Sequence, residues 1–128
     1  MKLFSLLLLS GSIVGCAAIE TPQSTSASVW HSYGLEQGEK GWVKLTQARL
    51  TELDTTQTFN QELYAAYTQG YEVGRDNYCQ QSAFDLGLSG NTYLGVCDRQ
   101  YPNYRQQYVS GKTAAEWGYN KNMHGDYL

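Results

Sequence analysis

The first cysteine of the chain ends a short motif that directs covalent modification of a thiol. Residues 13–16 read Ile-Val-Gly-Cys, and they follow an apolar run from Leu3 to Leu9 that begins directly after Lys2. A basic start, an apolar stretch and small residues at the cleavage point are typical of an export signal. Because Cys16 ends this motif, we expect lipoprotein signal peptidase to cut before it. Its Sγ would then carry diacylglycerol, and the new α-amine an acyl chain such as palmitate.

An ordinary secretory signal and a membrane-spanning anchor are the alternatives for this segment. The apolar run is shorter than the ~20 residues of a transmembrane helix, and Ala17-Ala18 makes a poor site for the ordinary signal peptidase. Several acyl chains, at ~0.8 kcal/mol per buried CH₂, would hold the protein on a membrane stably. Ala17 also stands where lipoproteins retained in the inner membrane carry Asp. We therefore expect a lipid anchor in the outer membrane, with the protein facing the periplasm.

Composition indicates one small, mildly acidic domain behind this anchor. The predicted order is a signal peptide (1–15), a lipidated cysteine with a flexible polar tether (16–28) and a single helical domain (29–128). Lys and Arg number 9 against 12 Asp and Glu, and the basic residues are scattered. Nucleic-acid binding needs a concentrated basic patch, so nucleic acid is not an expected partner.

Two cysteines, Cys79 and Cys97, remain once Cys16 carries lipid. A redox or metal pair is the alternative, but the chain has no Cys-x-x-Cys, and His31 and His124 stand near opposite ends. In an oxidising compartment, an isolated pair in a small domain usually forms a disulfide. We expect such a bond, worth roughly 3 kcal/mol in the chain-entropy model, and no metal or other cofactor.

Helical periodicity dominates the rest of the sequence, and strand-like alternation is confined to very short windows, so we predict an all-α fold. Apolar and small residues recur every three or four positions over residues 59–78, and Thr58-x-x-Gln61 has the form of a capping box. Pro102 suits the first turn of a second helix that runs to about residue 119. A further helix is predicted over residues 43–53, and a helical turn around residues 84–87.

A weak repeat runs through these elements, in which an aromatic residue is followed by glycine three positions later. Its best copies are Tyr67-x-x-Gly70-x-x-x-Gly74 and Tyr108-x-x-Gly111, with looser ones at His31/Gly34/Gly38 and Phe84/Gly87/Gly90. Phosphate-binding loops place glycine between a strand and a helix, with Lys or Ser/Thr following, which is not the pattern here. Residues at these spacings share one helix face. We therefore predict that Gly70, Gly74 and Gly111 let a neighbouring helix approach closely.

The chain is rich in aromatic residues, with 11 Tyr and 3 Trp. Tyrosine can bury its ring while its hydroxyl stays at the wet edge, so most tyrosines are predicted to build the core. The alternative is a surface that binds sugar or a partner, because exposed aromatics are enriched at interfaces. Trp30, Trp42 and Trp117 lie outside the strongest periodic faces, and we predict that they contribute to such a surface.

No catalytic residues are predicted, because the chain contains neither Gly-x-Ser-x-Gly nor His-Glu-x-x-His. The pairs Glu36/Glu39, Arg75-Asp76 and Asp98-Arg99 are interpreted as solvated or capping charges. These features favour a non-catalytic protein that binds another envelope protein or cell-wall material. The alternative is a periplasmic enzyme of glycan or peptide chemistry, which a pocket holding two carboxylates, or His31 beside a carboxylate, would favour.

The aromatic and glycine spacings, together with Tyr78-Cys79 and Gly95-Val96-Cys97, resemble a family of proteobacterial lipoproteins classified as domain of unknown function 2799. The similarity extends from about residue 30 to 119, and the spacing between the two cysteine motifs is its most specific part. The family also begins with a lipoprotein signal and a Trp/Tyr-Gly-x-x-x-Gly segment, which residues 30–38 match. Its members often carry more Arg after these glycines than this chain does. The resemblance implies no reaction and no ligand.

Overall fold

The computed structural model of the chain describes residues 19–123, and this part contains helices and no strand. The all-α prediction is therefore confirmed. The predicted lipidation site, Cys16, lies outside the described residues. In chain order the helices are α1 (Ala27–Glu39), α2 (Gln47–Leu53), α3 (Gln61–Cys79), α4 (Ala83–Leu88) and α5 (Tyr104–Met123).

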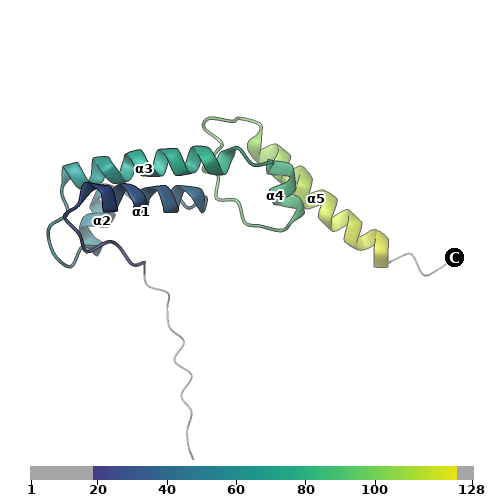
Figure 1. The fold of residues 1–128 in the computed structure, drawn as a ribbon. Coiled ribbons are helices and arrows are strands. Elements are labelled where there is room, and N and C mark those ends of the chain that lie inside the picture. The colour runs from purple at the N-terminus through teal and green to yellow at the C-terminus, as the bar shows by residue number, and fades with distance from the viewer. Residues whose placement is uncertain (1–18, 124–128) are drawn as a thin grey trace, which may run out of the picture.

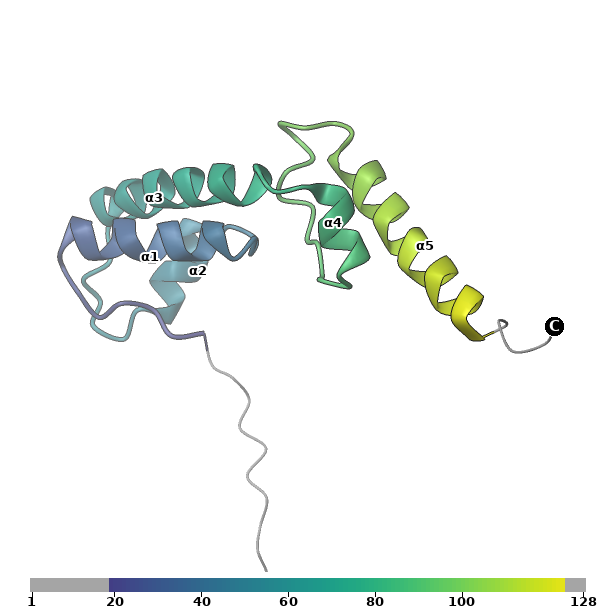
Figure 2. The same cartoon turned by 45° about the vertical axis from the view of Figure 1, so that its right-hand side comes forward.

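The helices form two parallel pairs that follow one another along an elongated molecule. In Figures 1 and 2, α1 lies beside α3, and α4 lies beside α5, while α2 crosses the first pair near its beginning. The extensive helix contacts are those within each pair. We call α1, α2 and α3 the first lobe, and α4, α5 and the loop that joins them the second lobe.

Glycines set the distance between α1 and α3, and they do so reciprocally. A Cβ on Gly34 would stand closer than 3.0 Å to the carbonyl oxygen of Tyr67, and a Cβ on Gly70 would meet the carbonyl oxygen of His31 in the same way. One turn later, Gly38 faces the backbone of Tyr71 and Arg75, and Gly74 faces that of Leu35 and Glu39. Both helices therefore approach backbone to backbone, which no larger residue at these four positions would permit.

The second lobe repeats this arrangement with α4 and α5. A Cβ on Gly87 would collide with the carbonyl oxygen of Tyr108, and one on Gly111 with that of Phe84. In both lobes, the first glycine of each repeat thus faces the carbonyl of the residue that opens the repeat on the partner helix. The second lobe has no counterpart of the Gly38 and Gly74 contacts, because α4 ends at Leu88. The weak repeat in the sequence therefore corresponds to one packing unit used twice.

Several helix boundaries differ from those predicted, and α5 for example begins at Tyr104, after Pro102, and runs to Met123. Helix α3 is capped by Asn60, whose side chain accepts from the N–H groups of Glu62 and Leu63, so the predicted capping box at Thr58 is wrong. Helix α2 begins only after Thr46, whose hydroxyl accepts from the N–H of Arg49 at 3.2 Å. The preceding segment, predicted as helix from residue 43, is instead bound in non-helical form by α3.

One helix was missed: residues 27–39 form α1, although their glycines gave only a loose copy of the repeat. Helix α1 begins within the predicted tether, and residues before it contact the first lobe. The indole N–H of Trp30 donates to the Ser24 carbonyl at 2.8 Å, and the Thr55 hydroxyl donates to Oε1 of Gln23 at 2.9 Å.

The first lobe closes over an aromatic core, and Trp30 lies at its centre. This tryptophan is 1% exposed, so its predicted place on a binding surface is wrong. Its ring packs at 4.5 Å from the Phe59 ring centroid and at 5.9 Å from that of Tyr33. A periodic face could not reveal this, because Phe59 comes from the loop before α3 rather than from a partner helix.

The second lobe has a separate core that contains the disulfide. Cys79 and Cys97 are bonded, with their Cα atoms 5.7 Å apart, which confirms the predicted pairing. Both cysteines are buried, and they pack with Ala83, Leu86, Tyr93 and Tyr104. Cys79 is the last residue of α3, so the bond ties the end of the first lobe to the loop that precedes α5.

A buried carboxylate shapes the turn between α2 and α3. Asp54 accepts from the N–H and hydroxyl of Thr56 with one oxygen, and from the N–H groups of Thr58 and Phe59 with the other. These bonds, the Thr56 hydroxyl first, hold the pKa of Asp54 below its ordinary value of 3.8. Asp54 thereby fixes the loop that carries Phe59 into the core.

Replacing Asp54 by Asn should therefore weaken the fold at neutral pH and flatten its acid dependence. A lowered carboxyl pKa contributes stability above the unfolded pKa, and this contribution is lost as the pH falls through the folded one. Asn keeps one acceptor but turns an N–H₂ group toward the other donors. Urea unfolding at pH 7 and pH 3 should show a smaller difference between the two pH values for Asp54→Asn than for the parent. Equal differences would contradict this role.

Candidate functional site

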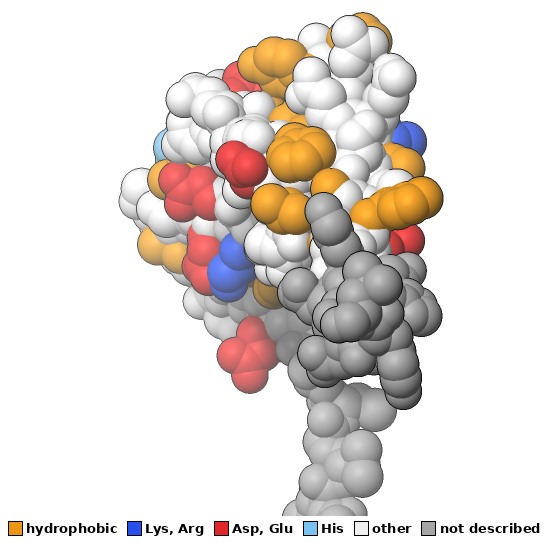
Figure 3. Space-filling view, turned by 90° about the vertical axis from the view of Figure 1, so that its right-hand side faces the viewer, with side chains coloured by type: hydrophobic (Ala, Val, Ile, Leu, Met, Phe, Trp, Pro, Cys, Tyr) orange, Lys and Arg blue, Asp and Glu red, His pale blue; other side chains and the backbone are white. Residues whose placement is uncertain are grey.

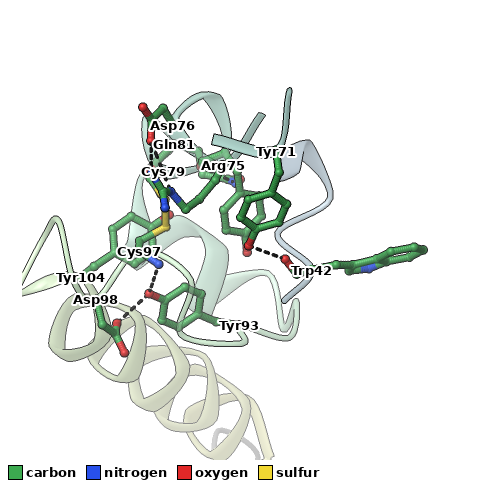
Figure 4. Close-up of a disulfide and its surroundings, with 11 residues drawn as sticks. Trp42, Tyr71, Arg75, Asp76, Cys79, Gln81, Tyr93, Cys97, Asp98 and Tyr104 are labelled. Carbon is green, nitrogen blue, oxygen red and sulfur yellow. Dashed lines mark hydrogen bonds and ion pairs between the residues drawn. A yellow bond between two sulfur atoms is a disulfide. The ribbon is translucent and has the colours of Figure 1, made fainter. Parts of the chain in front are cut away.

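The loop after α1 presents two large apolar side chains to solvent on a backbone that is held firmly. Trp42 is 47% exposed and Val43 is 60% exposed. The Tyr71 hydroxyl donates to the carbonyl of Trp42 at 2.8 Å, and the N–H of Leu45 donates to the Tyr67 hydroxyl at 3.0 Å. Figure 4 shows the indole of Trp42 extending away from the helices while its carbonyl meets Tyr71. We call residues 42–45 the Trp42 loop.

The tyrosines that hold this loop are buried, and their ionisation is suppressed. Burial raises the pKa of Tyr67 to about 12, although the bond from the N–H of Leu45 lowers it in part. Burial likewise raises the pKa of Tyr71. Both hydroxyls are therefore neutral at physiological pH, and they act as fixed hydrogen-bonding groups rather than as acids. The loop is positioned by the same helix, α3, that packs against α1.

A hollow of about 670 Å³ opens beside the Trp42 loop. Its apolar lining comes from the loop, from α1 and from the segment before α1; the residues are Ile19, Tyr33, Trp42, Val43 and Leu45. Binding sites for small ligands have volumes of about 300–1,000 Å³ and are lined mainly by such side chains. The hollow thus has the size and apolar character of a binding site.

Charged groups surround this hollow and nearly balance each other. Glu20, Glu36 and Lys40 line it, and Nζ of Lys40 lies 2.6 Å from a carboxylate oxygen of Glu36. The same ammonium lies 4.7 Å from the ring centroid of Trp42. Lys44, within the loop, lies 5.5 Å from the ring centroid of Tyr64. With Lys44 counted, two carboxylates and two ammonium groups lie at or beside the hollow.

One polar atom in the lining has no partner among the described residues. The Tyr33 hydroxyl is buried, and no protein hydrogen bond to it is found. Burial and the neighbouring Glu36 raise its pKa, so it remains protonated. It therefore keeps a hydrogen-bond donor that no described residue uses.

The other predicted surface tryptophan, Trp117, lies on α5 and is 72% exposed. On the neighbouring helix, Phe84 and Leu88 are also exposed, and their spacing puts them on one face of α4. Figure 3 views the molecule from this end, where hydrophobic side chains lie among mostly uncharged ones and acidic side chains gather to one side. The structure therefore places Trp42 and Trp117 on different lobes and does not bring them together.

The loop of the second lobe contains a charge network that the sequence did not reveal. The Tyr93 hydroxyl donates to Asp98 at 2.6 Å and accepts from the N–H of Cys97 at 3.0 Å, as Figure 4 shows. The guanidinium of Arg105 binds the other oxygen of Asp98, with Nε at 2.7 Å. Asp98 was interpreted with its neighbour Arg99, but its partner is seven positions away. This network braces the disulfide loop against α5.

The remaining sequence candidates take structural positions. Arg75 and Asp76 form an ion pair at 3.1 Å, and His31 contributes its backbone carbonyl to the contact with Gly70. Within residues 19–123, no three His, Cys, Asp or Glu side chains gather as metal ligands would. No helix in that range is both long and apolar enough to cross a bilayer.

The fold and these surfaces define a small, disulfide-stapled helical protein built from two glycine-packed helix pairs. A family model described as "Protein of unknown function (DUF2799)" matches residues 29–113. This range holds all four glycine-facing contacts of α1 and α3, both contacts of α4 and α5, and the disulfide. The chain belongs to this family. No curated protein and no solved structure matches it significantly.

Proposed function

We propose that this protein is a lipoprotein anchored in the outer membrane, facing the periplasm, and that it acts by binding rather than by catalysis. The observation that carries this proposal is the use of its cysteines. The structure pairs Cys79 with Cys97, and such bonds persist in oxidising compartments such as the periplasm. The third cysteine, Cys16, directly follows Ile13-Val14-Gly15, the motif of lipoprotein processing.

Exposed apolar side chains on firmly held backbone support the binding role. The Trp42 loop is fixed by two hydrogen bonds to side chains of α3, yet it exposes Trp42 and Val43. Surface apolar residues scattered singly are normal, whereas grouped ones mark interaction sites. At this location, such a surface would meet a component of the envelope: the membrane, an envelope protein or cell-wall material.

An enzyme of periplasmic glycan or peptide chemistry is the second candidate, and one observation favours it. Glu20 and Glu36 both line the hollow, and paired carboxylates serve as acid and base in glycoside hydrolysis. Glu36 already binds Lys40 at 2.6 Å, so one of the two carboxylates has a structural partner. Incubating the purified protein with peptidoglycan would separate the candidates: release of soluble fragments that Glu20→Gln abolishes would favour the enzyme.

Replacing Cys16 by Ser should abolish lipid attachment, because this residue supplies the thiol that accepts diacylglycerol. In cells grown with radiolabelled palmitate, the parent protein should be labelled and should fractionate with the outer membrane. Cys16→Ser should remain unlabelled, either as an uncleaved precursor or as soluble periplasmic protein. Normal labelling of this variant would refute the proposed anchor.

A second substitution tests which membrane the protein is sorted to, separately from lipid attachment. In an enterobacterial host, Ala17→Asp should keep full palmitate labelling but move the protein to the inner membrane. Ala17→Ser is the matched control, and it should stay in the outer membrane. An unchanged distribution of Ala17→Asp would contradict the outer-membrane assignment while leaving lipidation in place.

A further inference from the structure

The chain reaches the hollow beside the Trp42 loop three residues after the proposed anchor. Ile19 lines the hollow beside this loop and is 50% exposed. Only Ala17 and Ala18 separate it from Cys16. Because an extended chain spans at most ~3.6 Å per residue, the Cα of Cys16 lies within about 11 Å of the Cα of Ile19. A lipid on Cys16 would therefore bring the first lobe, and this surface in particular, close to the bilayer.

The exposed side chains here are those that suit a bilayer surface. Tryptophan is enriched where membrane meets water, because one part of its indole is apolar and its N–H is polar. Trp42 and Val43 extend outward from the loop, with Ile19 beside the same hollow. Lys40 and Lys44 flank them, and lysine can keep its ammonium in water while its stem covers apolar surface.

From this placement we infer that Ile19, Trp42 and Val43 rest in the headgroup region of the bilayer to which Cys16 is anchored. This inference rests on the proposed function, because it requires the anchor. The balanced charges of Glu20, Glu36, Lys40 and Lys44 make apolar burial, rather than attraction to anionic lipid, the driving force. The lipid and the Trp42 loop together would fix the orientation of the first lobe on the bilayer.

A chemical anchor tests this inference independently of cellular lipidation. Cys79 and Cys97 are bonded to each other, so a phospholipid maleimide would couple selectively to the Cys16 thiol of residues 16–128. The coupled protein is bound to vesicles of phosphatidylethanolamine and phosphatidylglycerol whose acyl chains are brominated near the glycerol. Bromine quenches the fluorescence of tryptophan at that depth.

Two matched variants assign the signal, because each keeps buried Trp30 and one exposed tryptophan. Trp117→Phe retains Trp42, and its emission should be strongly quenched. Trp42→Phe retains Trp117, and its emission should be nearly unchanged. Omitting phosphatidylglycerol should not reduce the quenching of Trp117→Phe, since the contact is apolar.

Three results would overturn the inference. Quenching of Trp42→Phe rather than Trp117→Phe would place the second lobe on the membrane. Absence of quenching in both would place the Trp42 loop away from the bilayer. Quenching that appears only when the maleimide lipid itself is brominated would mean that the anchor's own chain occupies the hollow. If these vesicles give the expected pattern but Cys16→Ser is still labelled in cells, then only the proposed anchor fails.

Discussion

Replacing Gly70 by Ala is expected to lower the stability of the protein strongly, although alanine is a better helix former than glycine. The new Cβ would stand closer than 3.0 Å to the His31 carbonyl oxygen, which is backbone and cannot rotate away. Forcing packed backbones apart costs roughly 3 kcal/mol. For a domain of this size, that loss lowers the melting temperature by roughly 10 °C or more. Thermal unfolding followed by circular dichroism measures it.

Gly118 offers a matched control for this prediction. It lies on α5, and a Cβ there would meet nothing within 4 Å. Gly118→Ala should therefore raise stability by about 0.5–1 kcal/mol, the ordinary gain in a helix. Gly111→Ala should behave like Gly70→Ala, because it faces the Phe84 carbonyl. If both Gly70→Ala and Gly111→Ala melt like the parent, close backbone packing is not what these glycines provide.

Replacing Cys79 and Cys97 together by Ala is expected to cost roughly 3 kcal/mol, the chain-entropy value for a loop of this length. The loss should fall mainly on the second lobe. Both cysteines belong to its core, and the extensive helix contacts lie within each lobe. Hydrogen exchange should therefore accelerate in α4 and α5 more than in α1 and the first turns of α3.

The double replacement is preferable to a single one, because a lone thiol at 79 or 97 could form a disulfide between two molecules. Tyr93→Phe provides the comparison, since it removes the hydrogen bonds to Asp98 and Cys97 but keeps the disulfide. We expect Tyr93→Phe to accelerate hydrogen exchange in the second lobe less than the double replacement does. Equal acceleration of exchange in both lobes of the double variant would show that the molecule unfolds as one unit.

The sequence was sufficient to predict the helical class, the disulfide and a packing role for Gly70, Gly74 and Gly111. Cysteine chemistry and helical spacing are local signals, which can be recognised without knowing which segment of the chain packs against them. The pairing of α1 with α3 was not predictable in this way. The copy of the repeat at Gly34 and Gly38 lacks a leading aromatic residue, since His31 stands there and contributes only its backbone carbonyl.

The sequence failed to predict the positions whose burial or backbone conformation depends on residues far away in the chain. Trp30 lies off the periodic faces, but Phe59 and the Ser24 carbonyl complete its burial. The Trp42 loop looked helical, yet Tyr67 and Tyr71 hold its backbone from another helix. These contacts join residues more than twenty positions apart, except that between Trp30 and Ser24, and no local pattern encodes them. The contacts of Tyr67 and Tyr71 also shape the hollow, of which the sequence predicted only Trp42 as a surface residue.

The mass of the mature protein tests the account most directly. Protein purified from the cell envelope without reduction should be analysed intact and after proteolysis by mass spectrometry. The account predicts a chain that begins at Cys16 and carries diacylglyceryl and N-acyl groups, with a crosslinked peptide pair containing Cys79 and Cys97. A mature chain with an unmodified Cys16, or with free thiols at Cys79 and Cys97, would contradict it.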